Sequence, residues 1–392
     1  MRDASGGAPP TVGIVAGEAS GDTLAAALIG AVRARDPRIR FVGVAGPKMQ
    51  AQGCETWVPL ETLSVGGFVE VLAHLPEILR VRRMVSRRFR REHIDLFVGV
   101  DAPDFNLGLE QTLRRHGIRT MHFVSPSVWA WRRERIAKIR AAVDRILVLF
   151  PFEHALYEEA QVPVTFVGHP LAAEAAGPGA RRATREALKL RPATPVFALL
   201  PGSRLAEIDK HAPLVLGAAA RIYEARPDAQ FLVPLVSRPT REAFTEAQHR
   251  AGLEALPLTI LYGHASDALR AADIGLVASG TATLEAAFAR CPHVIFYQMA
   301  PLTVRIIARK FLLPYVGLPN ILAGRFVVPE LLQDSATVTN LAQAALNLFD
   351  DTVTRRRLEA LFAGMSRAMA VDTGALAADA VIAELRAAGV EC

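Results

Sequence analysis

The sequence predicts an α/β protein with two halves, each a doubly wound parallel sheet covered by helices. A chain of 392 residues exceeds what one hydrophobic core ordinarily supports, which favours two domains. Short apolar runs such as TVGIVAG alternate with helical patterns such as TLAAALIGAVRAR. This alternation is typical of β-α-β units, and it occurs in two successive series, which predicts two Rossmann-like domains.

The two series set the expected domain boundaries. Strand-like runs begin at residues 11, 40, 96, 120, 145 and 164 in the first series, and at 196, 230, 258, 274 and 293 in the second. Between them, residues 173–190 are rich in small and charged side chains, which predicts a linker with one short helix. We expect a disordered tail over residues 1–10, an N-terminal domain over 11–172 and a C-terminal domain over 191–365.

Composition excludes several classes of protein. A hydrophobic fraction of 51% with 21% charged residues is that of a globular chain and not of a disordered one. Cys54, Cys291 and Cys392 lack the spacing of metal ligands and are odd in number, so neither a zinc site nor a disulfide framework is expected. The N-terminus lacks the apolar segment of a signal peptide, and no stretch of about 18 apolar residues predicts a membrane span. We therefore expect a cytoplasmic protein.

A strongly basic helix is expected over residues 80–92. Its sequence, RVRRMVSRRFRRE, carries seven arginines, with Val81, Met84, Val85 and Phe89 at helical spacing as the buried face. An ordinary solvated helix and a surface that binds anionic lipid both fit this pattern. Nucleic acid is disfavoured, because the segment offers only Phe89 as an aromatic platform for bases.

Polar residues follow the first predicted strand. The turn GEASGD, from Gly17 to Asp22, places Glu18 and Ser20 at the start of a helix. Ligands of doubly wound sheets bind beyond the carboxyl ends of the strands, which makes both side chains site candidates. The alternative is that Ser20 or Asp22 caps the helix.

Two further strand ends of the first half carry candidates. Asp101 directly follows the run LFVGV and is a candidate general base, with a turn aspartate as the alternative. Its spacing from Asp104 differs from the D-x-D of metal-dependent sugar-nucleotide sites, so no metal is expected. Ser125 and Trp129 follow the next strand and are candidates for substrate contacts, with an aromatic core as the alternative for Trp129.

The second half has strand ends suited to an anion. In LLPGSR, Gly202 and Ser203 precede Arg204, whose guanidinium can neutralise a phosphate. The later stretch SGTATLE begins a helix after an apolar strand, and a helix N-terminus attracts anions. The candidates in that stretch are Ser279, Gly280, Thr281 and Thr283.

Glu285 extends this site from an anion to a nucleotide. A capping box would need Ser or Thr three residues earlier, where the chain has Ala282. A carboxylate one turn into the helix can instead accept both hydroxyls of a ribose. Together with Arg204 it predicts a nucleoside diphosphate, while the absence of GxGxxG and GxxxxGK[ST] disfavours redox dinucleotides and P-loop hydrolysis.

In order and spacing, these segments resemble the lipid-A-disaccharide synthase family of inverting glycosyltransferases. The resemblance runs from about Val12 to about Thr337. The motifs that carry it are GEASGD, GVDAPDFN, FVSPSVWAWR, LFPFE, FVGHPL, LLPGSR, SGTATLE, PLT, LPNILAG and VVPELLQ. Two segments depart from the family: SGDTLAA replaces SGDLHG, and SVGGFVEVL replaces AVMGLVEVL. The departures leave acyl-chain length and acceptor detail open.

The resemblance implies a GT-B architecture and a reaction. The nucleotide would lie mainly on the second domain and the acceptor mainly on the first, to which a helix over residues 366–392 would return. UDP-2,3-diacylglucosamine would give its sugar to 2,3-diacylglucosamine 1-phosphate (lipid X), forming a β-1,6-linked disaccharide and UDP without a metal or cofactor. Asn320 and Glu330 would help to bind the nucleotide or its sugar.

The implied mechanism is a single displacement. Asp101 would take the proton of the acceptor 6-hydroxyl, with Glu18 as the competing base. Arg204 and the helix start at Ser279 would stabilise the departing UDP. Two alternatives stay open: another UDP-sugar enzyme on the same fold, such as a UDP-N-acetylglucosamine 2-epimerase, and a noncatalytic protein that binds membrane surfaces.

The acylated substrates imply a membrane partner. Peripheral attachment to the anionic inner face of the cytoplasmic membrane of a Gram-negative bacterium is expected, through the apolar and basic stretches 65–81 and 301–319. Core helices are the alternative for both stretches. No nucleic-acid partner is expected, and a homodimer is left open.

Overall fold

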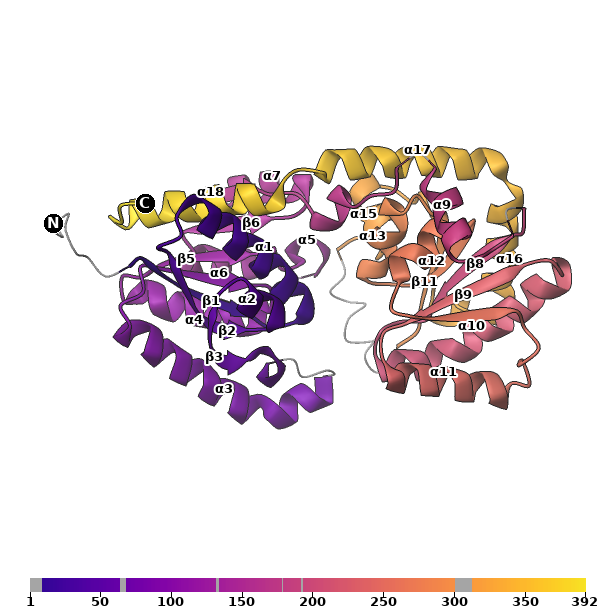
Figure 1. The fold of residues 1–392 in the computed structure, drawn as a ribbon, viewed down its shortest axis with the longest axis horizontal. Coiled ribbons are helices and arrows are strands. Elements are labelled where there is room, and N and C mark those ends of the chain that lie inside the picture. Colours follow the sequence, from indigo (N-terminus) through magenta and orange to yellow (C-terminus); the bar gives the residue numbers. More distant parts are fainter. Residues whose placement is uncertain (1–8, 64–67, 132–133, 178, 192, 300–311) are drawn as a thin grey trace. The chain divides into compact units, whose positions relative to one another are not determined.

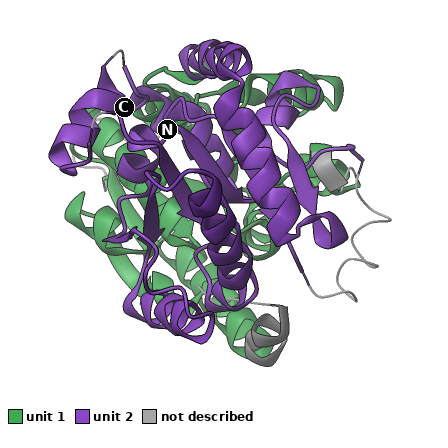
Figure 2. Cartoon of the chain, turned by 90° about the vertical axis from the view of Figure 1, so that its right-hand side faces the viewer, with its two compact units in different colours: residues 1–170, 369–392 green, residues 171–368 purple. Residues whose placement is uncertain are grey.

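The computed structural model describes residues 9–63, 68–131, 134–177, 179–191, 193–299 and 312–392. The chain divides into two compact units, which Figure 2 colours separately: residues 1–170 with 369–392 form the first unit, and residues 171–368 form the second. Most of the predicted tail over residues 1–10 lies outside the described residues. Pro10 is described and its carbonyl accepts a hydrogen bond from Arg40 N at 2.8 Å, so the chain already joins the first sheet there.

The first unit contains a parallel sheet in the strand order β3-β2-β1-β4-β5-β6-β7 (Figure 1). Because β1 pairs with β2 on one side and with β4 on the other, the winding reverses between β1 and β4. The strands are β1 (Thr11–Ala16), β2 (Arg40–Ala45), β3 (Glu55–Pro59), β4 (Leu96–Val100), β5 (Arg119–Phe123), β6 (Arg145–Val148) and β7 (Val164–Phe166).

Helices cover both faces of this sheet. One face packs against α1 (Ala19–Arg35) and α18 (Thr373–Ala387), and the other packs against α3 (Phe68–Arg91) and α4 (Pro103–Arg115). The last helix, α18, lies along α1, where Arg35 pairs with Asp379 at 2.8 Å. The remaining helices are α2 (Pro47–Ala51), α5 (Val128–Trp131), α6 (Arg135–Ala142) and α7 (Pro151–Glu159).

The second unit repeats the arrangement with a parallel sheet in the order β10-β9-β8-β11-β12-β13. Here the winding reverses between β8 and β11. The strands are β8 (Val196–Leu200), β9 (Gln230–Leu235), β10 (Leu258–Tyr262), β11 (Ile274–Ala278), β12 (His293–Tyr297) and β13 (Glu330–Leu332).

Two helical layers enclose this second sheet. One core contains residues of α10 (Leu205–Ala225), α11 (Arg238–Arg250), α16 (Val338–Asp350) and α17 (Thr352–Met369). The other contains residues of α12 (Ala265–Ala271) and α13 (Thr281–Phe288). Two further short helices are α8 (Pro170–Ala173) and α15 (Leu318–Ala323).

The segment predicted as a linker, residues 173–190, is packed into the second unit. It contains α9 (Ala180–Ala187), the one short helix expected there. Arg185 of this helix is buried, with an ion pair to Asp273 at 2.8 Å and a hydrogen bond to Ala271 O at 2.8 Å. These contacts fix α9 to the start of β11.

Candidate functional site

In the first unit, the loops after β1 and β4 touch at the point where the winding reverses. A Cβ built on Gly17 would lie 2.3 Å from the Cβ of Ala102, so only glycine allows this approach. Crevices at such reversal points are where doubly wound sheets bind ligands. The fold therefore brings the GEASGD and DAPDFN segments together at one edge.

Asp101 occupies a strained turn at this edge. Asp101 and Ala102 have φ values of 53° and 43°, in the left-handed region that residues other than glycine rarely adopt. Asp101 N donates to Phe123 O at 2.8 Å, and Pro103 then starts α4. The Asp101 side chain is half-buried. Strain of this kind, of order 1–3 kcal/mol for each residue, is found most often at functional sites.

The GEASGD segment exposes Glu18 and Ser20. Glu18 is the N-cap residue of α1, and neither Ser20 nor Asp22 caps that helix, contrary to the alternative raised from the sequence. Asp22 is buried and accepts hydrogen bonds from Gly46 N, Lys48 N and Met49 N, at 3.0–3.1 Å. It therefore caps α2, which leaves the Glu18 and Ser20 side chains at the rim.

Ser125 and Trp129 are engaged within the first unit. Ser125 Oγ lies 2.8 Å from the Tyr157 hydroxyl, and Trp129 Nε1 donates to Glu153 Oε1 at 2.9 Å. Burial raises the pKa of Glu153 to about 7, against the hydrogen bonds it accepts. Both predicted contact residues thus serve to hold α5 and α7 beside the ends of β5 and β6.

In the second unit, the PGSR loop after β8 folds around Glu207 of α10. The Glu207 carboxylate accepts from Ser203 N at 2.9 Å and Arg204 N at 3.2 Å, and the Tyr297 hydroxyl donates to it at 3.0 Å. Gly202 has φ 129°, and a Cβ there would lie 2.6 Å from the Glu207 Cβ. With these two N–H groups occupied, the loop offers an anion the exposed side chains of Ser203 and Arg204.

His211 of α10 also holds this loop, a contact that was not predicted from the sequence. Its Nδ1 donates to Pro201 O at 2.7 Å, and its Nε2 accepts from Gln298 N at 3.1 Å. The imidazole is fully buried. A histidine at the second turn of an apolar helix was the only sequence signal for this contact.

The start of α13 is open in the way that an anion site requires. Gly280 is its N-cap residue, with φ 149° and no side-chain cap, and the first N–H groups of a helix lack partners within it. Ser279 is half-buried, while Gly280 and Thr281 are exposed. Thr283 departs from the prediction, because it is fully buried and its hydroxyl donates to Gly280 O at 2.8 Å.

Glu285 lies one turn into α13 and is half-buried. It lines a narrow cavity of about 10 Å³ together with Ser266 and Arg270 of α12. Burial raises the pKa of its carboxyl group. The cavity has room for about one water molecule, so it is not a preformed ribose pocket.

Asn320 and Glu330, which the sequence suggested as ligand contacts, are hydrogen-bonded to each other and to the backbone. The Asn320 amide donates to Val328 O and Glu330 Oε1, and its Oδ1 accepts from Val327 N and Val328 N. Because the amide has two hydrogens and two acceptor positions, its capacity is filled. Glu330 also accepts from Val316 N at 2.9 Å. The ligand contacts proposed for these two residues stay predictions.

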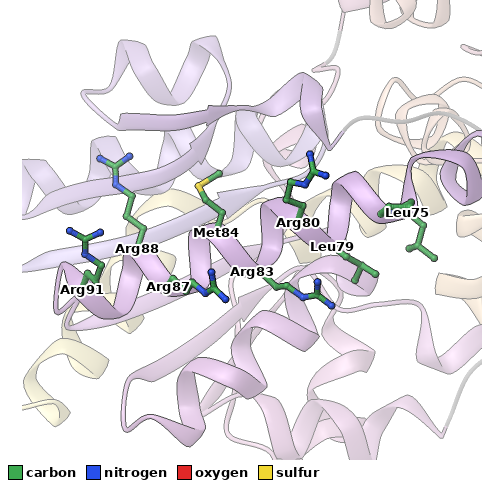
Figure 3. A pocket seen from close by; sticks show the side chains of 9 residues that line it. Leu75, Leu79, Arg80, Arg83, Met84, Arg87, Arg88 and Arg91 are labelled. Carbon is green, nitrogen blue, oxygen red and sulfur yellow. The ribbon is translucent and has the colours of Figure 1, made fainter.

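The outer face of α3 is a separate basic surface (Figure 3). Val81, Val85 and Phe89 are buried, as predicted, but Met84 is 43% exposed and lies on the arginine face instead. Leu75 is 42% exposed on the same helix. An open groove of about 850 Å³ follows this face; the residues that line it are Leu75, Pro76, Leu79, Arg80, Arg83, Met84, Arg87, Arg88 and Arg91.

The described residues include neither a membrane-spanning helix nor a cluster of metal ligands. No helix in the described part of the chain is long and apolar enough to cross a bilayer. Among the same residues, no group of three or more His, Cys, Asp or Glu side chains is placed to bind a metal ion. The stretches 65–81 and 301–319 are described only in part, so the surfaces expected at residues 65–67 and 301–311 lie outside the described residues.

Solved structures share the fold over nearly the whole chain. The glycotransferase of kitacinnamycin superposes with a TM-score of 0.64 at 18% identity, covering 96% of this chain and 99% of its own. A putative UDP-N-acetylglucosamine 2-epimerase from Listeria monocytogenes gives 0.62 at 12% identity, covering 95% and 94%. At these identities the likeness concerns the fold alone, and it establishes the GT-B architecture of two parallel-sheet domains.

Sequence relatives are far more similar. A lipid-A-disaccharide synthase from Chromobacterium violaceum is 50% identical over 371 residues, which is 95% of this chain and 96% of that protein. One from Pseudomonas aeruginosa is 49% identical over 371 residues, covering 95% and 97%. The family model for lipid-A-disaccharide synthetase matches residues 12–380. The chain therefore belongs to the lipid-A-disaccharide synthase family of glycosyltransferases.

Proposed function

We propose that the protein joins UDP-2,3-diacylglucosamine and 2,3-diacylglucosamine 1-phosphate into the β-1,6-linked disaccharide of lipid A, releasing UDP. Identity of about 50% to lipid-A-disaccharide synthases over nearly the full length carries this proposal. An epimerase would share the fold but gains no support from sequence. A noncatalytic binding protein would leave the strained Asp101 turn and the open start of α13 unexplained.

We assign the base of the reaction to Asp101. Its carboxylate takes the proton from the acceptor 6-hydroxyl while that oxygen forms a bond to the anomeric carbon of the donor. The bond between this carbon and the UDP oxygen breaks, and UDP leaves with the electron pair. Glu18, exposed on the neighbouring loop, is the competing candidate. The left-handed turn supports Asp101, since a fixed backbone limits the orientations of its carboxylate.

We assign the diphosphate of UDP to the second unit. The candidates are the N–H groups of Gly280 and Thr281 and the hydroxyls of Ser279 and Thr281, with the side chains of Ser203 and Arg204. Positive charge at the helix start and on Arg204 would offset the charge that develops on departing UDP, which needs no acid on the leaving group. Glu285 is proposed as the ribose contact, for which its narrow cavity must widen.

The groove on α3 is proposed as the membrane contact. Arg80, Arg83, Arg87 and Arg91 are exposed on one helix with Met84 among them. Basic side chains near an anionic lipid surface contribute roughly 1 kcal/mol each, and exposed apolar side chains add burial in the interface. This surface would place a soluble fold at the bilayer that holds its acylated substrates.

Mass spectrometry of the products tests the proposed reaction. Incubation with both diacyl substrates should yield one product with the combined mass of the two sugar units, together with UDP. Omitting the acceptor should abolish both products. Recovery of the donor in epimerised form, with no condensed product, would reject the proposal in favour of the epimerase alternative.

A further inference from the structure

Three buried polar side chains border the Asp101 turn. Asn106 and Glu110 lie one turn apart on α4, and His122 lies on β5; each has 0% exposure. Glu110 Oε1 is 2.7 Å from His122 Nδ1. The pair needs the glycine at position 99 of β4, because a Cβ there would stand 2.2 Å from Glu110 Oε1. The fold thus makes room for a carboxylate directly on the sheet.

Packing does not account for this cluster. Among the described residues, Asn106 Oδ1, Glu110 Oε2 and His122 Nε2 have no hydrogen-bond partner. Leaving a buried polar atom unpaired is costly, and α4 is otherwise apolar on this side, with Phe105 and Leu109 in the core. Apolar side chains of similar volume would avoid that cost. The cluster therefore calls for a role other than stability.

Asn106 connects the cluster to the Asp101 backbone. Its Nδ2 donates to Asp101 O at 2.8 Å and lies 3.4 Å from both Val15 O and Val100 O. One amide thus ties the ends of β1 and β4 to the left-handed turn. A strained backbone persists only where contacts with its surroundings hold it, and this hydrogen bond is one such contact.

His122 lies beside the Asp101 turn: it is paired with Gly99 in the register of β5 with β4, and its neighbour Phe123 accepts the hydrogen bond from Asp101 N. Burial lowers the pKa of His122, but the charge of Glu110, its hydrogen bond and the charge of Asp101 raise it by more, so the net direction is upward. Burial also raises the pKa of Glu110, while the charge of His122 and the hydrogen bond between the two groups act to lower it. Coupling between two sites is reciprocal, so a proton on His122 stabilises the Asp101 carboxylate as that carboxylate stabilises the proton.

We propose that Asn106, Glu110 and His122 are positioning residues that hold the Asp101 turn and stabilise its carboxylate. The inference rests on the role proposed for Asp101. Other charged groups on the surrounding elements are Glu18 after β1, Asp104 on α4 with its partner Arg135, and Arg82, whose guanidinium reaches α4 at Gly108 from α3.

Glu110→Gln tests the electrostatic part, since it keeps size and hydrogen bonding but removes the charge. We expect kcat to fall by about 10-fold, the effect of about 1.4 kcal/mol on the barrier, with KM nearly unchanged. Without the negative charge of Glu110, His122 loses its proton more readily. A neutral His122 no longer stabilises the Asp101 carboxylate, so the acidic limb of the pH profile of kcat/KM should move to higher pH.

Glu384→Gln is the matched control. Glu384 is also buried in the first unit, but it pairs with Arg119 and Arg145 at the amino ends of β5 and β6. This variant should lower the melting temperature and leave the pH profile in place. A Glu110→Gln protein with the wild-type kcat and acidic limb would overturn the inference.

A measurement on His122 itself covers the case in which Glu110→Gln fails to fold. In protein with ¹⁵N-labelled histidine, the titration midpoint of His122 should be lower in Asp101→Asn than in the wild type, because a neighbouring negative charge is lost. Equal midpoints would overturn the coupling. An inactive wild type would reject the proposed function instead, and an active Asp101→Asn would reject Asp101 as the base.

Discussion

Asp101 joins three features at one residue: the end of β4, a left-handed backbone and contact with a buried polar cluster. Arg204 has a comparable place in the second unit, at the end of β8, where Glu207 and His211 fix its loop. In both units the reactive side chain is thus presented by a backbone that other residues hold. This predicts that each side chain can be changed with little loss of stability.

Asp101→Asn should lower turnover by about 10²- to 10⁴-fold, the usual value of general base catalysis, with UDP affinity and melting temperature nearly kept. Asp104→Asn is the control, since Asp104 is exposed in the first turn of α4 and pairs with Arg135. Single-turnover rates corrected for folded fraction decide between them. Loss of turnover in Asp104→Asn alone would move the base from Asp101 to its neighbour.

Arg204→Ala should weaken UDP binding by about 10- to 150-fold, because hydrogen bonds to charged groups contribute about 1.5–3 kcal/mol each. Arg226→Ala removes a half-buried arginine from the far end of α10, where it pairs with Asp350, and should bind UDP normally. Isothermal titration calorimetry measures both. If the two variants bind UDP equally well, Arg204 is not a diphosphate contact.

At the scale of elements, the strands that are buried on both faces have the clearest sequence pattern. β1, β4, β8 and β11 consist of buried residues throughout, so their sequences are continuous apolar runs. The edge strands β3 and β13 were missed. β3 has one buried residue among five and ends at a proline, and β13 has three residues, all half-buried, so neither forms a long apolar run.

The candidate site residues also differ in how much of their role the sequence can predict. Position at a strand end predicted Asp101, Arg204 and the start of α13 as site candidates, and their roles stay predictions. Asn320 and Thr283 carry polar groups that bind ligands or backbone equally well, and only their contacts show that the backbone is their partner. The Asn106 cluster could not be found from the sequence, because it joins a helix to a strand through tertiary contact.

The α3 surface yields a prediction about membranes. Arg83→Ser with Arg87→Ser removes two exposed charges, which should weaken binding to vesicles rich in phosphatidylglycerol by about 30-fold at roughly 1 kcal/mol each. Arg356→Ser with Arg357→Ser on α17 removes the same charge from the second unit and serves as the control. Sedimentation with vesicles that shows equal binding of both double variants would make α3 an ordinary solvated helix.

The contact between α5 and α7 predicts a pH effect on stability. The pKa of Glu153 rises from 4.5 to about 7 on folding, so the folded state holds its proton more tightly than the unfolded state. Protonated Glu153 therefore adds to the free energy of unfolding. This contribution is fully present below about pH 4.5 and is lost as the pH rises through 7. Denaturant unfolding of Glu153→Gln, compared with the wild type, should show a smaller loss between these values. Parallel curves would contradict the burial of this carboxyl group.

At the scale of the whole molecule, the two units share one type of fold. Each sheet reverses its winding once, between β1 and β4 or between β8 and β11, and each reversal creates one edge where two loops meet. The chemistry differs between the edges: carboxylates at Glu18 and Asp101 in the first unit, and an arginine with an open helix start in the second. This division suits a base for an acceptor on one unit and an anion site for UDP on the other.

The configuration of the new glycosidic bond tests the proposed mechanism most directly. A single displacement, with Asp101 removing the acceptor proton, inverts the α-linked anomeric carbon of the UDP donor. Proton NMR of the purified disaccharide should therefore show a β linkage to the 6-position of the acceptor. An α linkage would mean that the configuration is retained, which a single displacement cannot give, and it would contradict the account.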